Sequence, residues 1–332
     1  MAHQLEIRNG QASMMYVGEV PWHGLGTELK EPATAGEAIN AAKLDWEVMK
    51  LPLFVHKDSR AALRVENRYG IVRRDLWETG DCVVLGIVGP QYTPLQNSEA
   101  FRFFDPIVGK GEAIFHTAGV LDGGRRVWML AKLPGCIRVV RDDDVHKYLL
   151  LSNSHDGSSA VQVKFTPIRV VCQNTLTMAL SRGPTVRVVH TRNVKERLAN
   201  AEKALGIIRG RYDEIEDAFK KMVQVQMRDE RLRGYLNAVF PDPADPEDRR
   251  QRSRVESDRM WATYFFDEGK GNMAPSVRGT LWAAYNGVTE LIDQRGGQTA
   301  EKRLESVCFG DGHRVKARAY AIAVGKAREW AN

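Results

Sequence analysis

Cysteine is scarce in this sequence. Only four cysteines occur in 332 residues, and no two of them form a Cys-x-x-Cys pair. A zinc ribbon needs ligands that are paired closely in sequence, so that class of metal site is excluded. Isolated cysteines indicate reduced thiols in a cytosolic protein. They are Cys82, Cys136, Cys172 and Cys308.

Long apolar runs are absent as well. A membrane-spanning helix needs about 18 or more consecutive apolar residues, and the sequence contains no such run. The first residues carry charges and lack the apolar segment and small-residue cleavage site of a signal peptide. We therefore expect a cytoplasmic protein with no membrane partner.

The motifs that commonly identify enzymes are also missing. The sequence has no P-loop, no Gly-x-Gly-x-x-Gly and no Gly-x-Ser-x-Gly, and no two histidines stand four residues apart. Asp142, Asp143 and Asp144 could bind a metal, but a solvated turn explains them more simply. We therefore predict no catalytic residue, no cofactor and no metal ligand, and expect a protein that is not an enzyme.

What the sequence does contain is the composition of a globular protein. Hydrophobic residues make up 43% and charged residues 27%, which excludes disordered and collagen-like chains. A chain of 332 residues is long enough for two domains of ordinary size. The formal net charge of +6 weakly favours an anionic partner.

The first half of the chain has the pattern of an antiparallel sheet with helices. A short helix is expected from Thr34 to Ala42, and apolar alternation predicts strands over 46–55, 63–72 and 82–88. A helix over 94–108 should follow, with Asn97 or Ser98 as its cap. Three strands followed by a helix are typical of a sheet with a helix packed on one face.

A second β-rich stretch follows. Asp122, Gly123 and Gly124 between two apolar runs predict a hairpin. The remaining elements are expected as strands over 145–151 and 161–171, a short helix over 173–180 and a strand over 185–190. The fold class is therefore α+β, with an N-terminal arm over 1–30, an α+β core domain over 31–190 and a helical region over 191–332.

The helical region begins with a heptad pattern. Its apolar residues are Val194, Leu198, Ala201, Leu205, Ile208, Tyr212, Ile215, Phe219 and Met222. This seam indicates either pairing of helices within the chain or self-association, and we expect a homo-oligomer. The prolines at 241, 243 and 246 end the pattern. Further helices are predicted over 253–267, 276–294 and 314–330, the last with a solvated basic face of Arg314, Lys316, Arg318, Lys326 and Arg328.

Several segments carry a resemblance to a known family. They are Val17–Gly26 (VGEVPWHGLG), Ser154–Ser158 (SHDGS), Thr166–Leu176 (TPIRVVCQNTL), Trp282–Asn286 (WAAYN) and Arg303–Ser306 (RLES). With these segments the chain resembles the phage/plasmid-like protein family of unknown function (domain of unknown function 932). The resemblance implies a phage, prophage or plasmid gene, and it implies no activity and no catalytic residue.

One stretch of the chain is free of acidic residues. From residue 157 to residue 195 there is no Asp or Glu, whereas lysine and arginine recur. Such residues bind phosphates by direct pairing and counterion release. Strand alternation should place Lys164 on the solvent face, opposite Phe165. The predicted nucleic-acid-binding residues are Lys164, Arg169, Arg182, Arg187 and Arg192, although pairing with acids elsewhere would explain them equally well.

The polar loop before this stretch is a possible ligand loop. Hydroxyls and backbone N–H groups around Ser154, His155, Asp156 and Ser158 could hold a phosphate. A turn stabilised by its own Asp and Ser is the simpler interpretation. Cys172 and Asn174 could join His155 in a nucleophilic set, but their spacing carries no signature.

Together these features favour a nucleic-acid-binding protein that acts on single-stranded DNA in recombination or replication. The strand order is similar to that of single-strand annealing proteins, an analogy at the level of fold only. Exposed aromatic residues such as Trp77 or Tyr92 could stack on bases. The alternatives are a protein-interaction or counter-defence factor, and a hydrolase that uses His155, Asp156 and Cys172.

Overall fold

The structure is a computed structural model of the 332-residue chain. It describes residues 7–8, 11–18, 26–31, 33–58, 61–102, 113–141, 143–165, 167–169, 186–197, 211–295, 306 and 310–330. The chain divides into two compact units. Unit 1 comprises residues 1–134, 149–164 and 184–206, and unit 2 comprises residues 135–148, 165–183 and 207–332.

A large, mainly antiparallel sheet runs through unit 1. Its strand order is β13-β11-β10-β9-β8-β3-β4, with β12 paired to β10 off this path. The strands are β3 (Met14–Val17), β4 (Thr27–Leu29), β8 (Ile114–Leu121), β9 (Arg126–Val140), β10 (Asp143–Ser154), β11 (Val161–Phe165), β12 (Ile168–Arg169) and β13 (Val186–Val188). Two short strands, β1 (Ile7–Arg8) and β2 (Gln11–Ala12), pair separately. Strands β9 and β10 are long enough to contribute residues to both units.

The predicted hairpin after Leu121 is confirmed. β8 and β9 pair antiparallel from Ile114 opposite Lys132 to Leu121 opposite Arg126. The connecting turn η1 (Asp122–Gly124) has positive φ angles of 52° at Asp122 and 62° at Gly123. Glycine adopts this backbone conformation without a steric penalty, which explains the glycine-rich sequence.

Two short helices pack on this sheet. α1 (Ala35–Ala41) begins at Thr34, whose hydroxyl accepts a hydrogen bond from the Glu37 backbone N–H while the Glu37 carboxylate accepts one from the Thr34 N–H. This reciprocal cap explains why the helix begins there. α1 packs against β3, β8 and α3 (Asn97–Arg102). The part of the predicted 94–108 helix beyond residue 102 lies outside the described residues.

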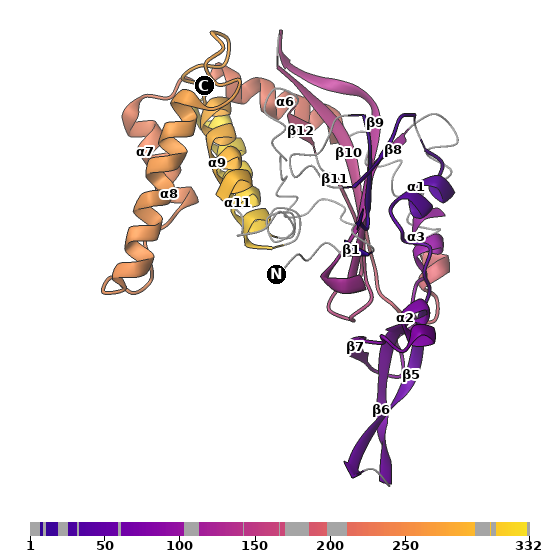
Figure 1. Ribbon diagram of the computed structural model, residues 1–332. Coiled ribbons are helices and arrows are strands. Elements are labelled where there is room, and N and C mark those ends of the chain that lie inside the picture. The colour runs from indigo at the N-terminus through magenta and orange to yellow at the C-terminus, as the bar shows by residue number, and fades with distance from the viewer. Residues whose placement is uncertain are drawn as a thin grey trace. The chain divides into compact units, whose positions relative to one another are not determined.

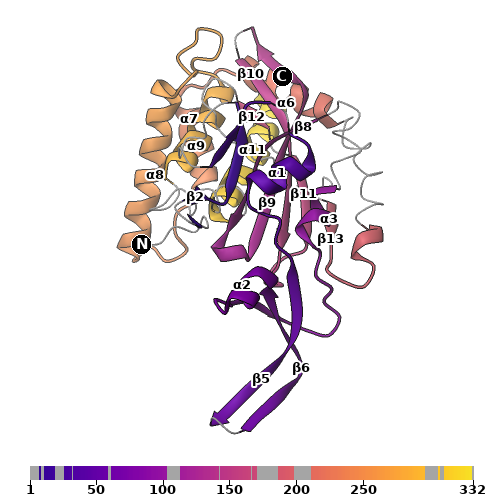
Figure 2. The same ribbon diagram turned by 45° about the vertical axis from the view of Figure 1, so that its right-hand side comes forward.

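The three strands predicted before α3 form a separate antiparallel sheet in the order β5-β6-β7. They are β5 (Val48–Asp58), β6 (Ala61–Arg73) and β7 (Val84–Val88). Between β6 and β7 the structure has a helix, α2 (Arg74–Thr79), where the sequence indicated only a turn. Gly80, with φ of 84°, ends this helix. In unit 1, β5 and β6 extend well beyond β7 and α2 (Figure 1, Figure 2).

The N-terminal segment contributes to the large sheet. β3 pairs parallel with β4 and antiparallel with β8, and all four of its residues are buried. The segment expected as an irregular arm over 1–30 therefore supplies sheet strands. Burial of the apolar side chains of Met14–Val17 stabilises the folded state, which favours this placement.

Unit 2 is mainly helical. Its described helices are α6 (Arg211–Gln224), α7 (Asp229–Val239), α8 (Arg249–Glu268), α9 (Leu281–Arg295) and α11 (Asp311–Trp330). The three helices predicted downstream of the prolines are confirmed as α8, α9 and α11, and the proline-rich segment separates α7 from α8. Helices α8 and α11 both pack along α9 (Figure 1).

The core of unit 2 surrounds α9, which is buried from Leu281 to Ile292. Phe219 of α6 lies 4.5 Å from Trp282 between ring centroids, and Tyr285 lies 5.9 Å from Tyr320 of α11. Gly287 lets α8 approach closely, since a Cβ atom there would lie 2.8 Å from the backbone N of Phe266. A helix that is buried on every side is expected at the centre of a bundle.

Residues Ile215, Phe219 and Met222 of the predicted heptad seam are buried in this core. Residues 198–210 of the seam lie outside the described residues, as does the helix predicted over 173–180. A continuous heptad helix and the self-association that it would support therefore stay predictions.

Two charged residues that the sequence placed in solvent are buried. Asp143 is 2% exposed and accepts a hydrogen bond of 2.7 Å from Trp282 Nε1 within unit 2. Lys316 is fully buried and pairs with Asp293. The prediction of a solvated turn was therefore wrong at Asp143, and that of a solvated basic face was wrong at Lys316. Trp282 donates a hydrogen bond to the buried carboxylate, and Asp293 compensates the buried ammonium charge.

The Asp143–Trp282 bond yields a testable expectation. Trp282→Phe keeps most of the ring volume but removes the N–H, which leaves a buried carboxylate oxygen without this donor. We expect the free energy of unfolding to fall by about 2–3 kcal/mol, measured by urea denaturation. Trp261→Phe is the control, since Trp261 is 45% exposed, and should change stability by less than about 0.5 kcal/mol. Equal effects of the two variants would contradict a stabilising role for the bond.

Candidate nucleic-acid interface

Lys164 and Arg187 lie on the same face of a pair of strands in unit 1. β11 and β13 pair antiparallel, with Gln162 opposite Arg187 and Val161 opposite Val188. Directly opposed residues point to the same side of a sheet, and alternate residues of one strand share a face. Gln162, Lys164 and Arg187 therefore share one face.

The opposite face of this strand pair is buried. Val161 and Val163 are at most 1% exposed and Val188 is 4% exposed, whereas Arg187 is exposed and Lys164 is half-buried. This confirms the alternation that the sequence predicted for Lys164. β13 is also the end strand of the sheet path, so the cationic face lies at a sheet edge.

Two further cations follow β13. Arg192 is exposed in the turn after the strand. Lys195 is also exposed, but its ammonium group forms an ion pair with the Glu99 carboxylate of α3 at 2.5 Å. An acidic residue outside the acid-free stretch therefore neutralises one of its cations. This is what we expect if the basic residues pair with acids elsewhere in the chain.

The other two predicted basic residues are not brought to this face. Arg169 lies in β12, where its backbone pairs with Val145 within unit 2. The structure describes the backbone of Arg169 but not its side chain. Arg182 lies outside the described residues, as do Cys172 and Asn174. The structure therefore brings together Lys164 and Arg187, with Arg192 following in the same unit.

The loop Ser154–Ser158 uses its own polar groups. The Asp156 carboxylate accepts hydrogen bonds from the Ser154 hydroxyl and, at 2.8 Å, from the Ser158 backbone N–H. Partial burial raises the pKa of Asp156, but these hydrogen bonds outweigh burial and hold the pKa below its usual value. The donors that a phosphate would need already donate to the loop's own carboxylate. The geometry of the loop is therefore that of a self-stabilised turn.

This loop also packs tightly against β7. A Cβ atom on Gly86 would lie 2.3 Å from the Asp156 backbone oxygen, and one on Gly157 would lie 2.9 Å from a Val88 methyl. Gly157 has φ of 78°, which favours glycine on its own. On the side facing β7 the contact distance leaves no room for a ligand.

His155 lies in the interior of unit 1. Its Nε2 is 2.9 Å from Asn97 Oδ1, and the Asn97 amide nitrogen donates to the backbone carbonyl of Leu44 at 3.0 Å. Because the Asn97 oxygen must then accept, His155 Nε2 carries a proton and Nδ1 does not. Complete burial, together with the charges of His190 and Arg73, lowers the pKa of His155 to about 3, although Asp156 opposes the shift.

The Trp46 ring packs on this histidine. It meets the imidazole edge-on at 5.4 Å between centroids, and the Arg73 guanidinium lies over the Trp46 ring at 4.3 Å from its centroid. His190 stacks on Tyr92 at 4.8 Å, and the Tyr92 hydroxyl donates to the Ser154 carbonyl at 3.1 Å. Tyr92 is thus a packing residue in this network, which leaves Trp77, at 54% exposure, as the accessible ring of the two expected stacking residues.

This environment does not favour acid–base chemistry by His155. A histidine with a pKa of about 3 is neutral at physiological pH and carries no proton to donate from Nδ1. The Asp156 carboxylate accepts hydrogen bonds from Ser154 and Ser158. A hydrolytic set with Cys172 gains no support from the described residues.

The β5–β6 hairpin is the surface that the sequence interpretation missed. Phe54, Val55 and Leu63 are 51%, 58% and 67% exposed. Phe54 lies opposite Arg64 across the two strands, and Val55 lies opposite Leu63. Large apolar groups that stay exposed in a folded protein mark interaction surfaces.

The hairpin is also cationic, and this signal was available in the sequence. Its acidic residues are Asp58 and Glu66, and its basic residues are Lys50, Lys57, Arg60, Arg64, Arg68 and Arg73. Arg64 and Arg68 are exposed, whereas Arg73 is buried and pairs with Asp75 at 2.8 Å. The apolar alternation over 46–55 and 63–72 predicts the two strands but does not show that their apolar residues stay exposed.

The family of the chain follows from comparison with family models. A model described as a domain of unknown function (DUF932) matches residues 84–319. The chain belongs to the DUF932 family. No curated protein and no solved structure matches it.

The DUF932 match begins at the first residue of β7 and ends within α11. It includes the Ser154–Ser158 loop, the β11–β13 pair and most of unit 2. The exposed part of the β5–β6 hairpin precedes the match, so the family model covers the cationic strand pair but not the hairpin.

Two features are absent from the part of the chain that the structure describes. Within it, no three His, Cys, Asp or Glu side chains gather in a way that could hold a metal ion. No described helix is long and apolar enough to cross a membrane. Cys82 and Cys136 carry free thiols.

The buried His155 predicts a pH dependence of stability. Its folded-state pKa of about 3 lies below the ordinary value of 6.5, so the unfolded chain binds the proton more readily. Stability is therefore fully present above pH 6.5 and falls as the pH drops below it, by about 1.4 kcal/mol per pH unit.

His155→Gln keeps a donor for Asn97 but does not titrate. Between pH 7.5 and pH 5, urea denaturation should show that the wild type loses about 2 kcal/mol more stability than this variant. His56→Gln, on the exposed hairpin, is the control and should follow the wild type. Parallel pH profiles of His155→Gln and the wild type would show that His155 is accessible to protons.

Proposed function

We propose that this protein binds nucleic acid and holds single-stranded DNA during recombination or replication. The observation that carries the proposal is the shared face of Lys164 and Arg187 on β11 and β13, where Arg187 is exposed and Lys164 half-buried, opposite a face of buried valines. Cations on one face of a sheet edge can pair with successive phosphates and release counterions.

The proposal extends to the setting of the protein. The resemblance to the phage/plasmid-like family supports a gene of a phage, prophage or plasmid, where replication and recombination proteins are common. The apolar residues of the heptad pattern support a homo-oligomer, and DNA metabolism would place the protein in the cytoplasm. No nucleotide cofactor and no catalysis are needed to hold a strand extended.

The preference for single strands rests on the hairpin. Phe54 is half-exposed and lies opposite the exposed Arg64, so an aromatic face and a cation occur side by side. Unpaired bases stack on aromatic rings, whereas bases within a duplex already stack on one another. Stacking on Phe54 with pairing of phosphates to Arg64 and Arg68 would therefore favour a single strand.

One observation favours a second candidate, a protein-interaction or counter-defence factor. Val55, Leu63 and Ile87 are all more than half exposed in the β5–β6–β7 sheet. An apolar surface of this kind also suits a protein partner. Failure of the protein to bind any oligonucleotide at low salt would favour this alternative.

The first test is fluorescence anisotropy with a labelled single-stranded oligonucleotide, titrated with salt. We expect the triple variant Lys164→Gln, Arg187→Gln and Arg192→Gln to weaken binding at least about tenfold. The slope of log K against log salt should fall in magnitude by about 2, because each lost phosphate contact on a single strand contributes about 0.7.

The matched control removes three other exposed cations. Arg249→Gln, Arg250→Gln and Arg252→Gln on α8 change the net charge by the same amount. If both triple variants reduce affinity and salt slope equally, only overall charge attracts the DNA and the cationic face is not the binding site.

The hairpin is tested by Phe54→Ala. Loss of one stacked base costs about 1–3 kcal/mol, so affinity for the single strand should fall about fivefold to a hundredfold while duplex affinity stays constant. Val55→Ala is the control, because Val55 is similarly exposed on the opposite face of the ribbon. An equal loss in both variants, or an equal loss for duplex, would exclude stacking on Phe54.

A further inference from the structure

Helix α8 of unit 2 carries large apolar side chains that the fold leaves in solvent. Met260, Trp261 and Tyr264 are 60%, 45% and 51% exposed. The Trp261 and Tyr264 rings meet edge-on at 5.6 Å between centroids. Exposed apolar groups that gather in this way mark an interaction surface, and the proposed function does not use it.

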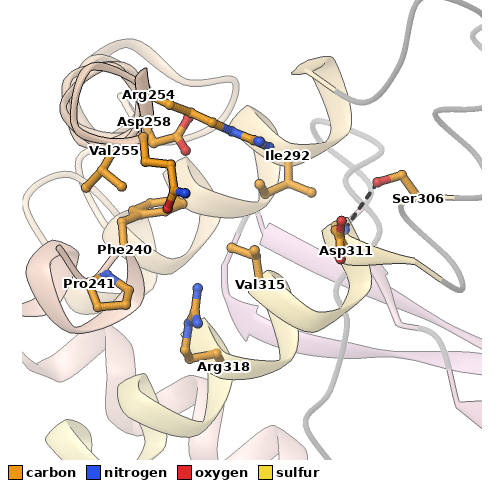
Figure 3. A pocket seen from close by; sticks show the side chains of 12 residues that line it. Phe240, Pro241, Arg254, Val255, Asp258, Ile292, Ser306, Asp311, Val315 and Arg318 are labelled. Atoms are coloured by element: carbon orange, nitrogen blue, oxygen red, sulfur yellow. Dashed lines mark hydrogen bonds between the residues drawn. The ribbon is translucent and has the colours of Figure 1, made fainter. Parts of the chain in front are cut away.

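The opposite side of α8 anchors the helix in unit 2. α8 packs on α7 and α9, and its residues Ala262 and Phe265 are buried. Figure 3 shows Val255 of α8 at a hollow that is also lined by Ile292 of α9 and Val315 of α11. The exposed aromatic rings therefore lie on the side of α8 that these helices leave open.

The open side of α8 forms one continuous face. Residues three or four positions apart in a helix lie on the same side. This spacing joins six residues, which we call the α8 face: Arg250, Ser253, Ser257, Trp261, Tyr264 and Glu268. All of them are exposed except Ser257, which is half-buried.

The charges at the two ends of α8 oppose the dipole of the helix. A helix carries a positive partial charge at its N-terminus and a negative one at its C-terminus. The first turn of α8 nevertheless holds Arg249 and Arg250, and the last turn holds Asp267 and Glu268. All four are exposed, and within the part of the chain that the structure describes none of them forms an ion pair. A partner with acids beside the first turn and cations beside the last would compensate both ends.

The two halves of the α8 face are also complementary in size. The first half has the small side chains of Ser253 and Ser257, and the second half has the large rings of Trp261 and Tyr264. Where two helices pack, large side chains of one fit into the gaps between side chains of the other. The first half of the face therefore fits the second half of another copy.

We propose that two copies of this chain pair antiparallel through the α8 face. A two-fold axis level with Arg259 places Ser257 of each copy opposite Trp261 of the other, because both lie two residues from that level. The same axis places Arg250 opposite Glu268, because both lie nine residues from it. The charges that oppose the dipole of one helix are then paired by the other copy.

This pairing requires neither DNA binding nor the heptad pattern over 194–222. A helix of 20 residues is about 30 Å long, and contact along one such helix buries less area than a standard protein interface. We therefore expect a weak dimer, with a Kd of about 1–100 µM.

Sedimentation equilibrium of the full chain tests the pairing, at concentrations from about tenfold below to about tenfold above this range. Arg250→Glu and Glu268→Arg should each weaken the dimer at least about tenfold, because each replaces two attractive contacts across the axis by two repulsive ones. Both substitutions suit the dipole of α8, so that each variant should stay folded, as thermal melts can verify.

An equimolar mixture of these two variants tests whether the contact lies between copies. One variant carries acids at both ends of α8 and the other carries cations at both ends. The mixed pair should therefore form with about the affinity of the wild type, although neither variant pairs well with itself. Trp261→Ser, which removes the ring without changing charge, should weaken the dimer at least about tenfold.

Arg252→Glu is the matched control. It reverses a charge at the same end of the helix, but Arg252 lies about 200° around the axis from Arg250, so that pairing should be unchanged. The proposal is overturned if the wild type stays monomeric over the whole range, if Arg252→Glu weakens the dimer as much as Arg250→Glu does, or if the mixture shows no rescue. A dimer that every variant leaves intact would assign self-association to another surface.

The DNA titrations need one addition, because Arg249 and Arg250 also occur in their charge control. Repeating them in the Trp261→Ser background, where pairing is weak, separates an effect on DNA binding from an effect on pairing. Failure of the α8 pairing and failure of DNA binding are therefore distinguished.

Discussion

The amide of Asn97 joins three segments of unit 1 that are far apart in sequence. Its nitrogen donates to the carbonyls of Leu44 and Trp46, and its oxygen accepts from His155. All three groups are buried, so removal of any partner would leave polar atoms without water, at a cost of about 1–3 kcal/mol. The adjacent Gln96 adds two hydrogen bonds to the backbone of Val48, the first residue of β5. The base of the hairpin and the end of β10 thus depend on one pair of amides.

This constraint separates residues that hold the fold from residues available to a partner. His155, Asp156 and Tyr92 have the side chains of a catalytic site, but they are bonded to Asn97, to their own loop and to the Ser154 carbonyl. The accessible groups are chemically simpler, namely the cations of the β11–β13 face and the aromatic and basic residues of the hairpin. Their arrangement suits binding by charge and stacking more than it suits bond cleavage.

In unit 2 the corresponding constraint is the burial of polar groups around the central helix α9. Because α9 is buried on all sides, its polar side chains form hydrogen bonds within unit 2: Glu290 accepts from the Lys270 backbone N–H, and the Asn286 amide nitrogen donates to the Trp282 carbonyl. Trp282 similarly donates a hydrogen bond to the buried Asp143 carboxylate, and Asp293 compensates the charge of the buried Lys316. Arg254 and Arg318 differ from these residues, since both are exposed and line a hollow between the helices.

The sequence by itself determined the local elements. Thr34 predicts the start of α1, the glycines after Asp122 predict the β8–β9 hairpin, and apolar periodicity predicts α8, α9 and α11, because caps, turns and periodicity are set by neighbours in the chain. Alternation also placed Lys164 on the open face of β11. Only the tertiary structure decided that His155 is neutral and buried, that Asp143 and Lys316 are internal, and that Phe54 is uncovered. Those outcomes depend on contacts with Asn97, Trp282 and Asp293 and on how much of the hairpin the rest of the chain covers, and contacts between distant residues leave no periodic trace in the sequence.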